Sequence, residues 1–320
     1  MLGYFRALLF RFTPSALLPV LVLSLLADRA WSAETAKERI AVYDVNVLER
    51  RPFDRGVFTQ GLAIDSGKLW VSSGLYGESF VERWDWRDAY RADSLNSAES
   101  VESVESAQSG ESAESGESAE SVGSVESPKT GLAESTTKER NRKARFELPD
   151  SLFAEGLTMH RGELFLLTWK SQKMVSIDPK WLEITKRYPL PGEGWGITSD
   201  GESLWISDGT PRIRKWREGA FQQTLSVTLR GKPLPRLNEL EWIDGEIWAN
   251  VWLTDQIVII SPTTGRVNGI IDLTNLLPKH ERRRNTDVLN GIAQDPETGD
   301  IWVTGKRWPA MYRIDLIERR

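Results

Sequence analysis

The chain has 320 residues, of which 40% are hydrophobic, so it is long enough to bury a sizeable core in one or two domains. Its net charge of −5 argues against nucleic acid or an anionic membrane surface as the main partner. With no cysteine and only two histidines, it can form neither a disulfide, nor a thiolate metal site, nor a multi-histidine metal site.

The first segment, residues 1–33, is typical of an export signal. Arg6 and Arg11 supply positive charge, residues 16–27 form an apolar run, and small residues that suit a signal peptidase follow. An uncleaved N-terminal anchor is the alternative, because the apolar run and its flanks approach the length of a membrane span. We expect cleavage, and therefore a periplasmic or secreted protein formed by residues 34–320.

Residues 89–143 differ in composition from the rest of the chain. From Ser94 to Pro128, glutamate recurs mostly at every third position among serine, alanine, glycine and valine, with no basic and no aromatic residue. Such a stretch cannot bury enough apolar surface to offset its chain entropy, and its like charges repel one another. We expect a disordered acidic insertion between two ordered elements, rather than a cation-collecting or partner-binding tail.

Outside the insertion, five segments repeat one pattern: a glycine-like position, a polar turn, then an apolar residue and an aromatic residue that open a strand. The copies are QGLAIDSGKLWVSSG (60–74), EGLTMHRGELFLLTW (155–169), WGITSDGESLWISDG (195–209), NELEWIDGEIWANVW (238–252) and NGIAQDPETGDIWVTGK (290–306). Each copy contains two β-rich runs around a turn, which predicts a hairpin. Third strands are expected at 80–86, 174–179, 211–216, 256–262 and 310–316, and fourth strands can be drawn at 221–229 and 266–273.

Four antiparallel strands per unit, with 40 to 54 residues between successive aromatic positions after the insertion, are typical of propeller blades. We therefore predict an all-β fold, a five-bladed β-propeller of four-stranded antiparallel blades over residues 34–320. The recurring tryptophans are expected to pack in the core between blades. They are Trp70, Trp205, Trp248 and Trp302.

Two positions vary where the rest of the repeat agrees. The residue before the glycine-like position is Gln60, Glu155, Trp195, Asn238 and Asn290 in turn. The residue four beyond the strand aromatic is Gly74, Trp169, Gly209, Trp252 and Lys306. Equivalent positions of different blades form rings around the central axis, so both sets are expected around one mouth. Repeats that agree in packing and differ at the rim indicate that the rim has a function.

The predicted rim offers one clear acid–base group, Glu155, in aromatic surroundings. Desolvation by tryptophan would raise the pKa of this carboxyl and suit a proton shuttle that works near neutral pH. The amides of Gln60 and Asn238 could orient an uncharged polar substrate. A glycosidase usually needs two carboxylates and a metal-dependent lactonase several, so both classes are disfavoured.

Other ionisable residues are interpreted as structural. Glu239 replaces the glycine of the fourth copy, where packing is expected. His160 and His280 fall in a predicted turn and a charged loop, and are interpreted as surface histidines.

At these positions the sequence resembles the plant and bacterial type of glutaminyl cyclase, the glutamine cyclotransferase family of five-bladed propellers. The resemblance covers about residues 40–320 apart from the insertion. It rests on six motifs in order: FTQGL (58–62), FAEGLT (153–158), GWGIT (194–198), LNELEW (237–242), WANVW (248–252) and VTGKRWP (303–309).

The resemblance implies an enzyme, a glutaminyl-peptide cyclotransferase that converts N-terminal glutamine of peptides or proteins to pyroglutamate and releases ammonia. It implies no cofactor and no metal. It also implies Glu155 as the catalytic acid and base. The implied pocket residues are Phe58, Gln60, Phe153, Trp169, Trp195, Asn238, Trp252 and Lys306.

The alternative is a non-catalytic propeller that binds a peptide or a glycan through its aromatic rim. Lys306 could steady a developing oxyanion or hold Glu155, and the sequence leaves both open. We expect a monomer with no nucleic-acid partner and no membrane contact beyond the N-terminal segment.

Overall fold

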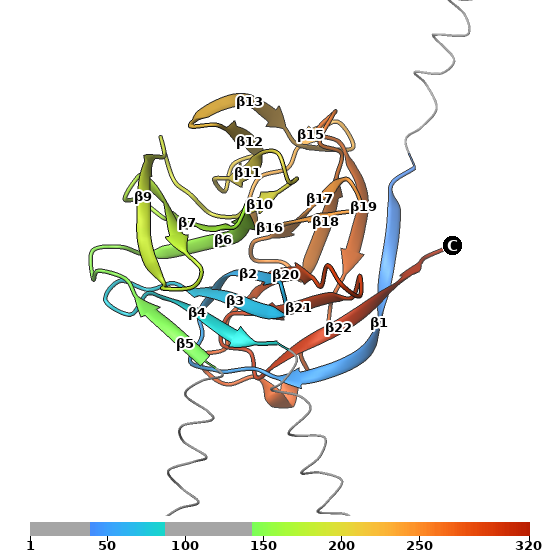
Figure 1. The fold of residues 1–320 in the computed structure, drawn as a ribbon. Helices are drawn as coiled ribbons and strands as arrows, with labels where there is room; N and C mark the ends of the chain where they lie inside the picture. Colours follow the sequence, from blue (N-terminus) through green and yellow to red (C-terminus); the bar gives the residue numbers. More distant parts are fainter. Residues whose placement is uncertain (1–38, 87–142) are drawn as a thin grey trace, which may run out of the picture. The chain divides into compact units, whose positions relative to one another are not determined.

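The computed structural model describes residues 39–86 and 143–320 (Figure 1). The predicted export segment lies outside the described residues, as does the predicted insertion apart from its last residue. That residue, Lys143, begins strand β5 (Lys143–Glu147). The described residues form strands and one short 3-10 helix, Lys279–Glu281, so the predicted all-β class is confirmed. No helix in this part of the chain has the length and hydrophobicity to span a bilayer.

Three sheets consist of four antiparallel strands in chain order. The first contains β2 (Thr59–Asp65), β3 (Lys68–Ser73), β4 (Phe80–Asp85) and β5. The second contains β6 (Ala154–His160), β7 (Glu163–Thr168), β8 (Lys173–Asp178) and β9 (Glu183–Pro189). The third contains β10 (Ile197–Ser199), β11 (Leu204–Ser207), β12 (Arg212–Arg217) and β13 (Ala220–Ser226), and the small hairpin β14 (Thr228–Leu229) and β15 (Lys232–Pro233) follows it.

The remaining sheet has eight strands, in two antiparallel runs of four. One run is β16 (Leu237–Ile243), β17 (Glu246–Val251), β18 (Gln256–Ile260) and β19 (Val267–Asp272). The other is β20 (Leu289–Gln294), β21 (Ile301–Gly305), β22 (Ala310–Glu318) and β1 (Ala41–Pro52). A short parallel ladder, in which Ala41 to Tyr43 of β1 pair with Gly269 to Ile271 of β19, joins the runs. Strand β1 therefore completes the last set by pairing along β22.

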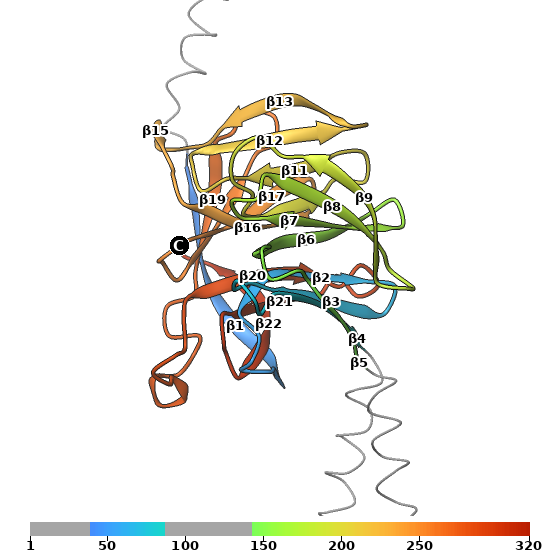
Figure 2. The same ribbon diagram turned by 90° about the vertical axis from the view of Figure 1, so that its left-hand side faces the viewer.

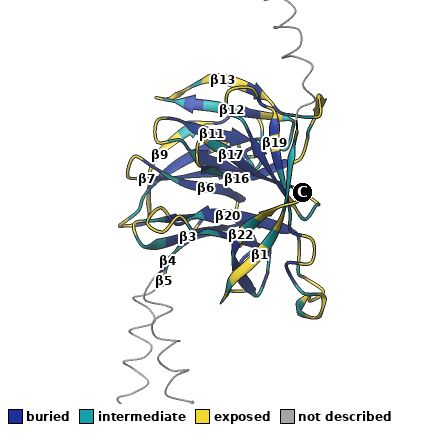
Figure 3. Ribbon diagram, turned by 90° about the vertical axis from the view of Figure 1, so that its right-hand side faces the viewer, coloured by how far each residue is buried: buried dark blue, intermediate teal, exposed yellow. Residues whose placement is uncertain are grey.

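The first strand of each set lies innermost. Strands β2, β6, β10, β16 and β20 contact one another in a closed ring, in that order, and the later strands of each set extend outward (Figures 1 and 2). In Figure 3 the inner strands are buried, whereas β1, β9 and β13 carry exposed residues.

Five clusters of buried apolar side chains fill the spaces between neighbouring sets. Each of four clusters contains one of the recurring tryptophans, Trp70, Trp205, Trp248 and Trp302, none of them more than 5% exposed. Their predicted core packing is confirmed.

The glycine-like position is where the inner strands touch. A Cβ atom on Gly61, Gly156 or Gly196 would lie 2.3, 2.7 or 2.0 Å from a backbone atom of the next inner strand or the residues leading into it. Glycine lets these backbones approach because it has no Cβ. Glu239 takes this position in β16 and is 1% exposed. Its carboxylate accepts hydrogen bonds from the backbone N–H of Leu62 in β2 and of Ile292 in β20, so its structural interpretation is confirmed.

Candidate active site

A cavity of about 410 Å³ lies where the inner strands begin. All nine residues that the resemblance implied line this one cavity: Phe58, Gln60, Phe153, Glu155, Trp169, Trp195, Asn238, Trp252 and Lys306. Leu75, Leu253 and Asp287, which the sequence analysis did not single out, complete the lining.

β-bulges direct the polar groups of the cavity. The pairing of inner and second strands shifts between Thr59 and Gly61, Ala154 and Leu157, Leu237 and Leu240, and Leu289 and Ile292. The residues skipped include Gln60, Glu155, Asn238 and Asn290. A bulge turns an inner-strand side chain away from its regular direction, which is why bulges recur beside active sites.

Asn290 is the exception at this ring of positions. It is fully buried and does not line the cavity. Its amide donates hydrogen bonds to the carbonyl oxygens of Thr59 and Gln60, at 3.0 and 3.3 Å. Asn290 therefore holds the start of β2 in place, and the prediction that it faces the mouth is wrong.

The two glycines of the second ring make room for cavity aromatics. A Cβ on Gly74 would lie 2.3 Å from the ring of Phe153, and one on Gly209 would lie 2.6 Å from the ring of Trp195. The other three members of that ring, Trp169, Trp252 and Lys306, reach the cavity themselves. Thus large and small side chains alternate around the rim as packing requires.

The aromatic wall is fixed from behind by one carboxylate. Trp169 and Trp195 both donate their indole N–H to Oε2 of Glu193, each at 2.9 Å. The ring of Trp195 meets that of Trp252 edge to face, with centroids 5.5 Å apart, and Phe153 lies 5.4 Å from Trp169. Glu193 lies in the connection between β9 and β10 and was missed by the sequence analysis.

Glu155 is the carboxylate inside the cavity and is 6% exposed. Gln60 donates its amide N–H to Glu155 Oε1 at 3.4 Å. Burial raises the pKa of Glu155 well above its usual range, the ammonium of Lys306 lowers it, and the charge of Glu193 raises it. This carboxyl therefore keeps its proton to a higher pH than an ordinary glutamate does, in the direction that the aromatic surroundings predicted.

Lys306 is the cation of the cavity and is 5% exposed. Burial lowers its pKa, while Glu155 and Asp287 raise it. Its ammonium lies 4.8 Å from the ring centroid of Phe58. Among the described residues, no carboxylate oxygen lies within 4.0 Å of the Lys306 Nζ atom. Lys306 therefore forms no direct ion pair with them.

Two buried amide oxygens of the cavity residues have no hydrogen-bond partner within the part of the chain that the structure describes: Oε1 of Gln60 and Oδ1 of Asn238. A buried acceptor without a donor costs about 1–3 kcal/mol, so these two oxygens are well placed to accept N–H groups of a ligand. An amine and a primary carboxamide both do so.

The two histidines lie outside the cavity. His160 ends β6 and is 7% exposed, and its Nδ1 is hydrogen-bonded to the Ser199 hydroxyl at 2.7 Å. It is thus a buried histidine with a partner, and its surface assignment is wrong. His280 is exposed in the 3-10 helix, as expected. Within residues 39–86 and 143–320, no three His, Cys, Asp or Glu side chains converge to hold a metal ion.

The converging sheets and the cavity define a class: an all-β protein with one buried carboxylate in an aromatic pocket. The model of the glutamine cyclotransferase family matches residues 18–102 and 105–316. The chain is 32% identical over 282 residues to the glutaminyl-peptide cyclotransferase of Arabidopsis thaliana, covering 86% of this chain and 72% of that protein. It also matches the crystal structure of Myxococcus xanthus glutaminyl cyclase with a TM-score of 0.65 and 25% identity, covering 88% of this chain and 100% of that one. The chain belongs to the glutamine cyclotransferase family.

Proposed function

We propose that this cavity cyclises the N-terminal glutamine of peptides and proteins to pyroglutamate, with Glu155 as the proton shuttle. The α-amine attacks the γ-carboxamide carbon of the same residue, a five-membered lactam forms, and the side-chain nitrogen leaves as ammonia. Family membership and the named activity of the Arabidopsis relative support the reaction. The observation that carries it here is Glu155, the buried carboxylate of the cavity, beside the amide oxygens of Gln60 and Asn238, which have no partner among the described residues.

One carboxylate suffices for this chemistry. Attack makes the amine nitrogen positive, and the departing nitrogen leaves only after it is protonated. Glu155 takes the proton from the first nitrogen and gives it to the second, so no net proton is gained or lost. The raised pKa of Glu155 suits both transfers near neutral pH.

Substrate conformation is the second requirement. Because the reaction is intramolecular, the enzyme needs to select a folded glutamine side chain rather than to bring two molecules together. The edge-to-face pair Trp195 and Trp252, with Phe58 and Phe153, form rigid walls for that conformer. Trp169 stands beside Phe153 and completes the cage.

The remaining polar groups complete the mechanism. The free oxygens of Gln60 and Asn238 accept N–H groups of the amine and the γ-amide. Lys306 stabilises the oxyanion of the tetrahedral intermediate, since it lines the cavity and, among the described residues, makes no ion pair with Glu155.

Ammonia release from a Gln-initiated peptide tests the activity, and Glu155→Gln tests the shuttle. The wild type should release ammonia and reduce the peptide mass accordingly, while Glu155→Gln should be about 10²–10⁴-fold slower. Glu183→Gln, an exposed glutamate of β9, is the matched control and should keep full turnover. Peptide binding without ammonia release would favour the binding-module alternative, and a fully active Glu155→Gln would remove the shuttle.

We propose further that the fold is a five-bladed β-propeller. Support comes from the ring of inner strands, the five clusters between neighbouring sets, and the single parallel ladder where two antiparallel runs meet. An experimental structure with five radially arranged sheets is the expected result, and any other number would contradict it.

We also propose that residues 1–33 direct export and that the enzyme acts as a monomer in the periplasm or outside the cell. The charged and apolar pattern of that segment supports this. N-terminal sequencing of the exported protein and light scattering on it test the two statements. An intact N-terminus in the cytoplasmic fraction, or a dimer mass, would contradict them.

A further inference from the structure

A second cavity, of about 480 Å³, lies beside the active-site cavity. The two share Leu253 and Asp287 as lining residues. The second cavity lies between the turn after β17 and the long connection from β19 to β20, and we call it the β19–β20 groove. Its other lining residues are Thr254, Asp255, Asn275, Leu277, Lys279, Arg282, Thr286 and Val288.

We propose that the β19–β20 groove binds the residues that follow the N-terminal glutamine and favours acidic side chains there. The proposal rests on the cyclisation proposed above. Once the first residue fills the aromatic cavity, the rest of the peptide has to extend away from it, and the groove adjoins the cavity at the two lining residues that they share.

The shared wall is built to face a ligand. Leu253 is 55% exposed and has a φ of 65°, in the left-handed region that a leucine rarely adopts. The turn is held because the backbone N–H and the hydroxyl of Thr254 both donate to the carbonyl oxygen of Val251. Residues held in this region concentrate at ligand clamps and active sites. Leu253 thus presents an apolar surface to a passing chain, and hydroxyl and amide groups of the groove suit a peptide backbone.

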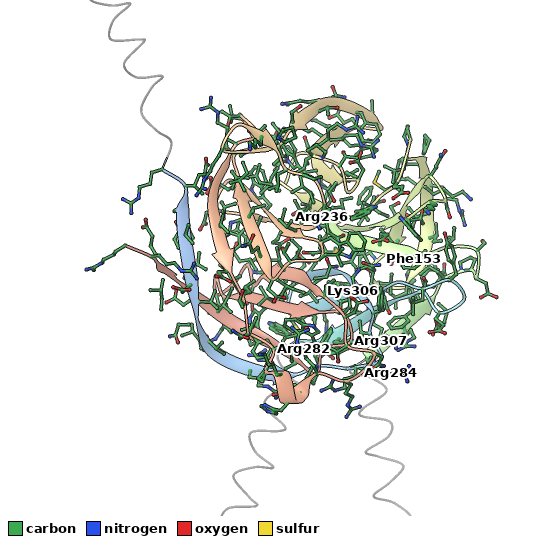
Figure 4. All side chains as sticks on the ribbon, turned by 180° about the vertical axis from the view of Figure 1, so that it is seen from behind. Phe153, Arg236, Arg282, Arg284, Lys306 and Arg307 are labelled. Atoms are coloured by element: carbon green, nitrogen blue, oxygen red, sulfur yellow. The ribbon has the colours of Figure 1, made fainter. Side chains whose placement is uncertain are left out.

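Positive charge gathers on the same face, although the chain as a whole has a net charge of −5. Figure 4 shows Arg236, Arg282, Arg284 and Arg307 on the face that also presents Phe153 and Lys306. Arg282 lines the groove, and the Arg307 guanidinium lies 5.8 Å from the ring of Phe58.

Among the described residues, none of the four arginines has a carboxylate within ion-pair distance. Glu281, the acid of the same loop, pairs instead with Arg50 at 2.6 Å. Inside the groove the carboxylates of Asp255 and Asp287 equal the cations of Lys279 and Arg282 in number, and Arg236, Arg284 and Arg307 add positive charge around it. Such a surplus attracts carboxylates and repels cationic residues.

Three peptides that differ only at positions two to four, with glutamates, alanines or lysines after the glutamine, test the preference. We expect kcat/KM to be highest for the acidic and lowest for the basic peptide, with about a tenfold span that shrinks in high salt. Glutamine amide, which has no following residue, should be turned over by the wild type. Equal kcat/KM for all three peptides would overturn the groove proposal, whereas no turnover even of glutamine amide would overturn the cyclisation itself.

The double variant Arg282→Ala/Arg284→Ala should reduce the acidic-to-basic ratio of kcat/KM to about two, mainly through KM for the acidic peptide. Arg187→Ala removes an exposed arginine of β9 and is the matched control, with an unchanged ratio. Melting temperatures confirm that both fold. A double variant that keeps the full ratio would overturn the proposed cause.

A second inference rests on a different observation, the shared carboxylate behind the aromatic wall. We infer that Glu193 is a positioning residue for the cage. One of its oxygens accepts both indole N–H groups, from Trp169 and Trp195. It does not line the cavity itself. Arg214 secures this loop by donating to the carbonyl oxygens of Pro191 and Glu193, at 2.6 and 3.4 Å.

Glu193→Gln and Glu193→Ala separate orientation from charge. The glutamine keeps an acceptor for both indoles, so KM should stay within about twofold of the wild-type value. Alanine leaves the two indole N–H groups without an acceptor, so it should raise KM about tenfold. Both variants remove a negative charge that raises the pKa of Glu155, so the acidic limb of kcat/KM should move to lower pH in both. Two variants with the wild-type KM and pH profile would overturn the inference.

Discussion

Two positions that are neighbours in every repeat behave in opposite ways. The glycine-like position is Gly61, Gly156, Gly196, Glu239 and Gly291, and the residue before it is Gln60, Glu155, Trp195, Asn238 and Asn290. The first position is nearly constant because inner-strand backbones touch at Gly61, Gly156 and Gly196, while Gly291 has a φ of 123°, in a region that favours glycine. The second varies because bulges release its side chain toward the cavity in three copies. In this repeat fold, the recurring residues build the scaffold of inner strands, and the residues that differ between repeats supply the chemical groups of the cavity.

A substitution at a glycine where the inner strands touch should have the largest effect, and that effect should be on stability. A Cβ on Gly196 would lie 2.0 Å from the carbonyl oxygen of Asn238, a backbone atom that cannot move aside cheaply. We expect Gly196→Ala to lose more than about 3 kcal/mol of unfolding free energy and to unfold at a much lower temperature, or not to fold. Gly192→Ala is the control. A Cβ at this position would meet no atom within 4 Å, and because the φ of Gly192 is 91°, the only cost is backbone strain of about 1 kcal/mol. Equal melting temperatures of Gly196→Ala and wild type would refute the close approach.

Removing the cation of the cavity should reduce the rate of catalysis with a much smaller loss of folding stability than Gly196→Ala. Lys306→Met removes the stabilisation of the oxyanion, so kcat should fall about 10²–10³-fold. It also removes the charge that lowers the pKa of Glu155. Since Glu155 must first act as a base, the acidic limb of kcat/KM should move to higher pH, opposite to Glu193→Gln. A shift in the same direction for both variants would contradict the assigned charges.

A substitution at Asn238, the residue before Glu239 in β16, should change activity and stability in different directions. Asn238→Leu removes a buried oxygen that accepts no hydrogen bond from any described residue, so the melting temperature should stay constant or rise. It also removes an acceptor for substrate N–H groups, and kcat/KM should fall about 10–100-fold. Thermal unfolding and ammonia release check the two halves. Loss of stability with normal activity would reverse our assignment of this ring.

The smallest effect is expected from a substitution of Glu241, which lies near the end of the inner strands opposite to the active-site cavity, and it concerns the pH dependence of stability. Glu241 lines a cavity of about 280 Å³ there and accepts hydrogen bonds from the Gln294 N–H and the Thr198 hydroxyl. Burial raises its pKa from 4.5 to about 8. Between these two values the folded protein keeps a proton that the unfolded chain has released, so stability falls as pH rises through this window.

Glu241→Gln should therefore unfold near the wild-type temperature at pH 5 and above it at pH 9, because the amide cannot ionise. The Thr198 hydroxyl can rotate to accept from the new amide. Glu183→Gln should follow the wild type at both pH values. A variant with an unchanged pH dependence would show that Glu241 does not ionise in this range.

Much of this site could be predicted because it repeats. Internal alignment found the inner strands, the tryptophans between sheets and both rings, and the family resemblance supplied the cavity residues outside the rings, Phe58 and Phe153. One further aligned position would have found Leu75 and Leu253, which directly follow Gly74 and Trp252. Asp287 has no counterpart in the other repeats, and no pattern marked it.

Other features depend on contacts that no local pattern encodes. Strand β1 is defined by a partner, β22, at the far end of the described chain. The outer strands β5 and β9 are largely exposed, so their hydrophobic signal is weak. Glu193 acts through two indoles rather than through the cavity, and His160 was misplaced because β6 extends to include it.

The most direct measurement is the turnover of Glu155→Ala on a Gln-initiated peptide, with and without added formate. The cavity left by the missing carboxyl can admit a small carboxylate, which can move the proton in its place. We predict a loss of turnover of at least about 10²-fold without formate, and partial recovery that saturates with formate concentration. Wild-type turnover of Glu155→Ala in the absence of any carboxylate would contradict the account.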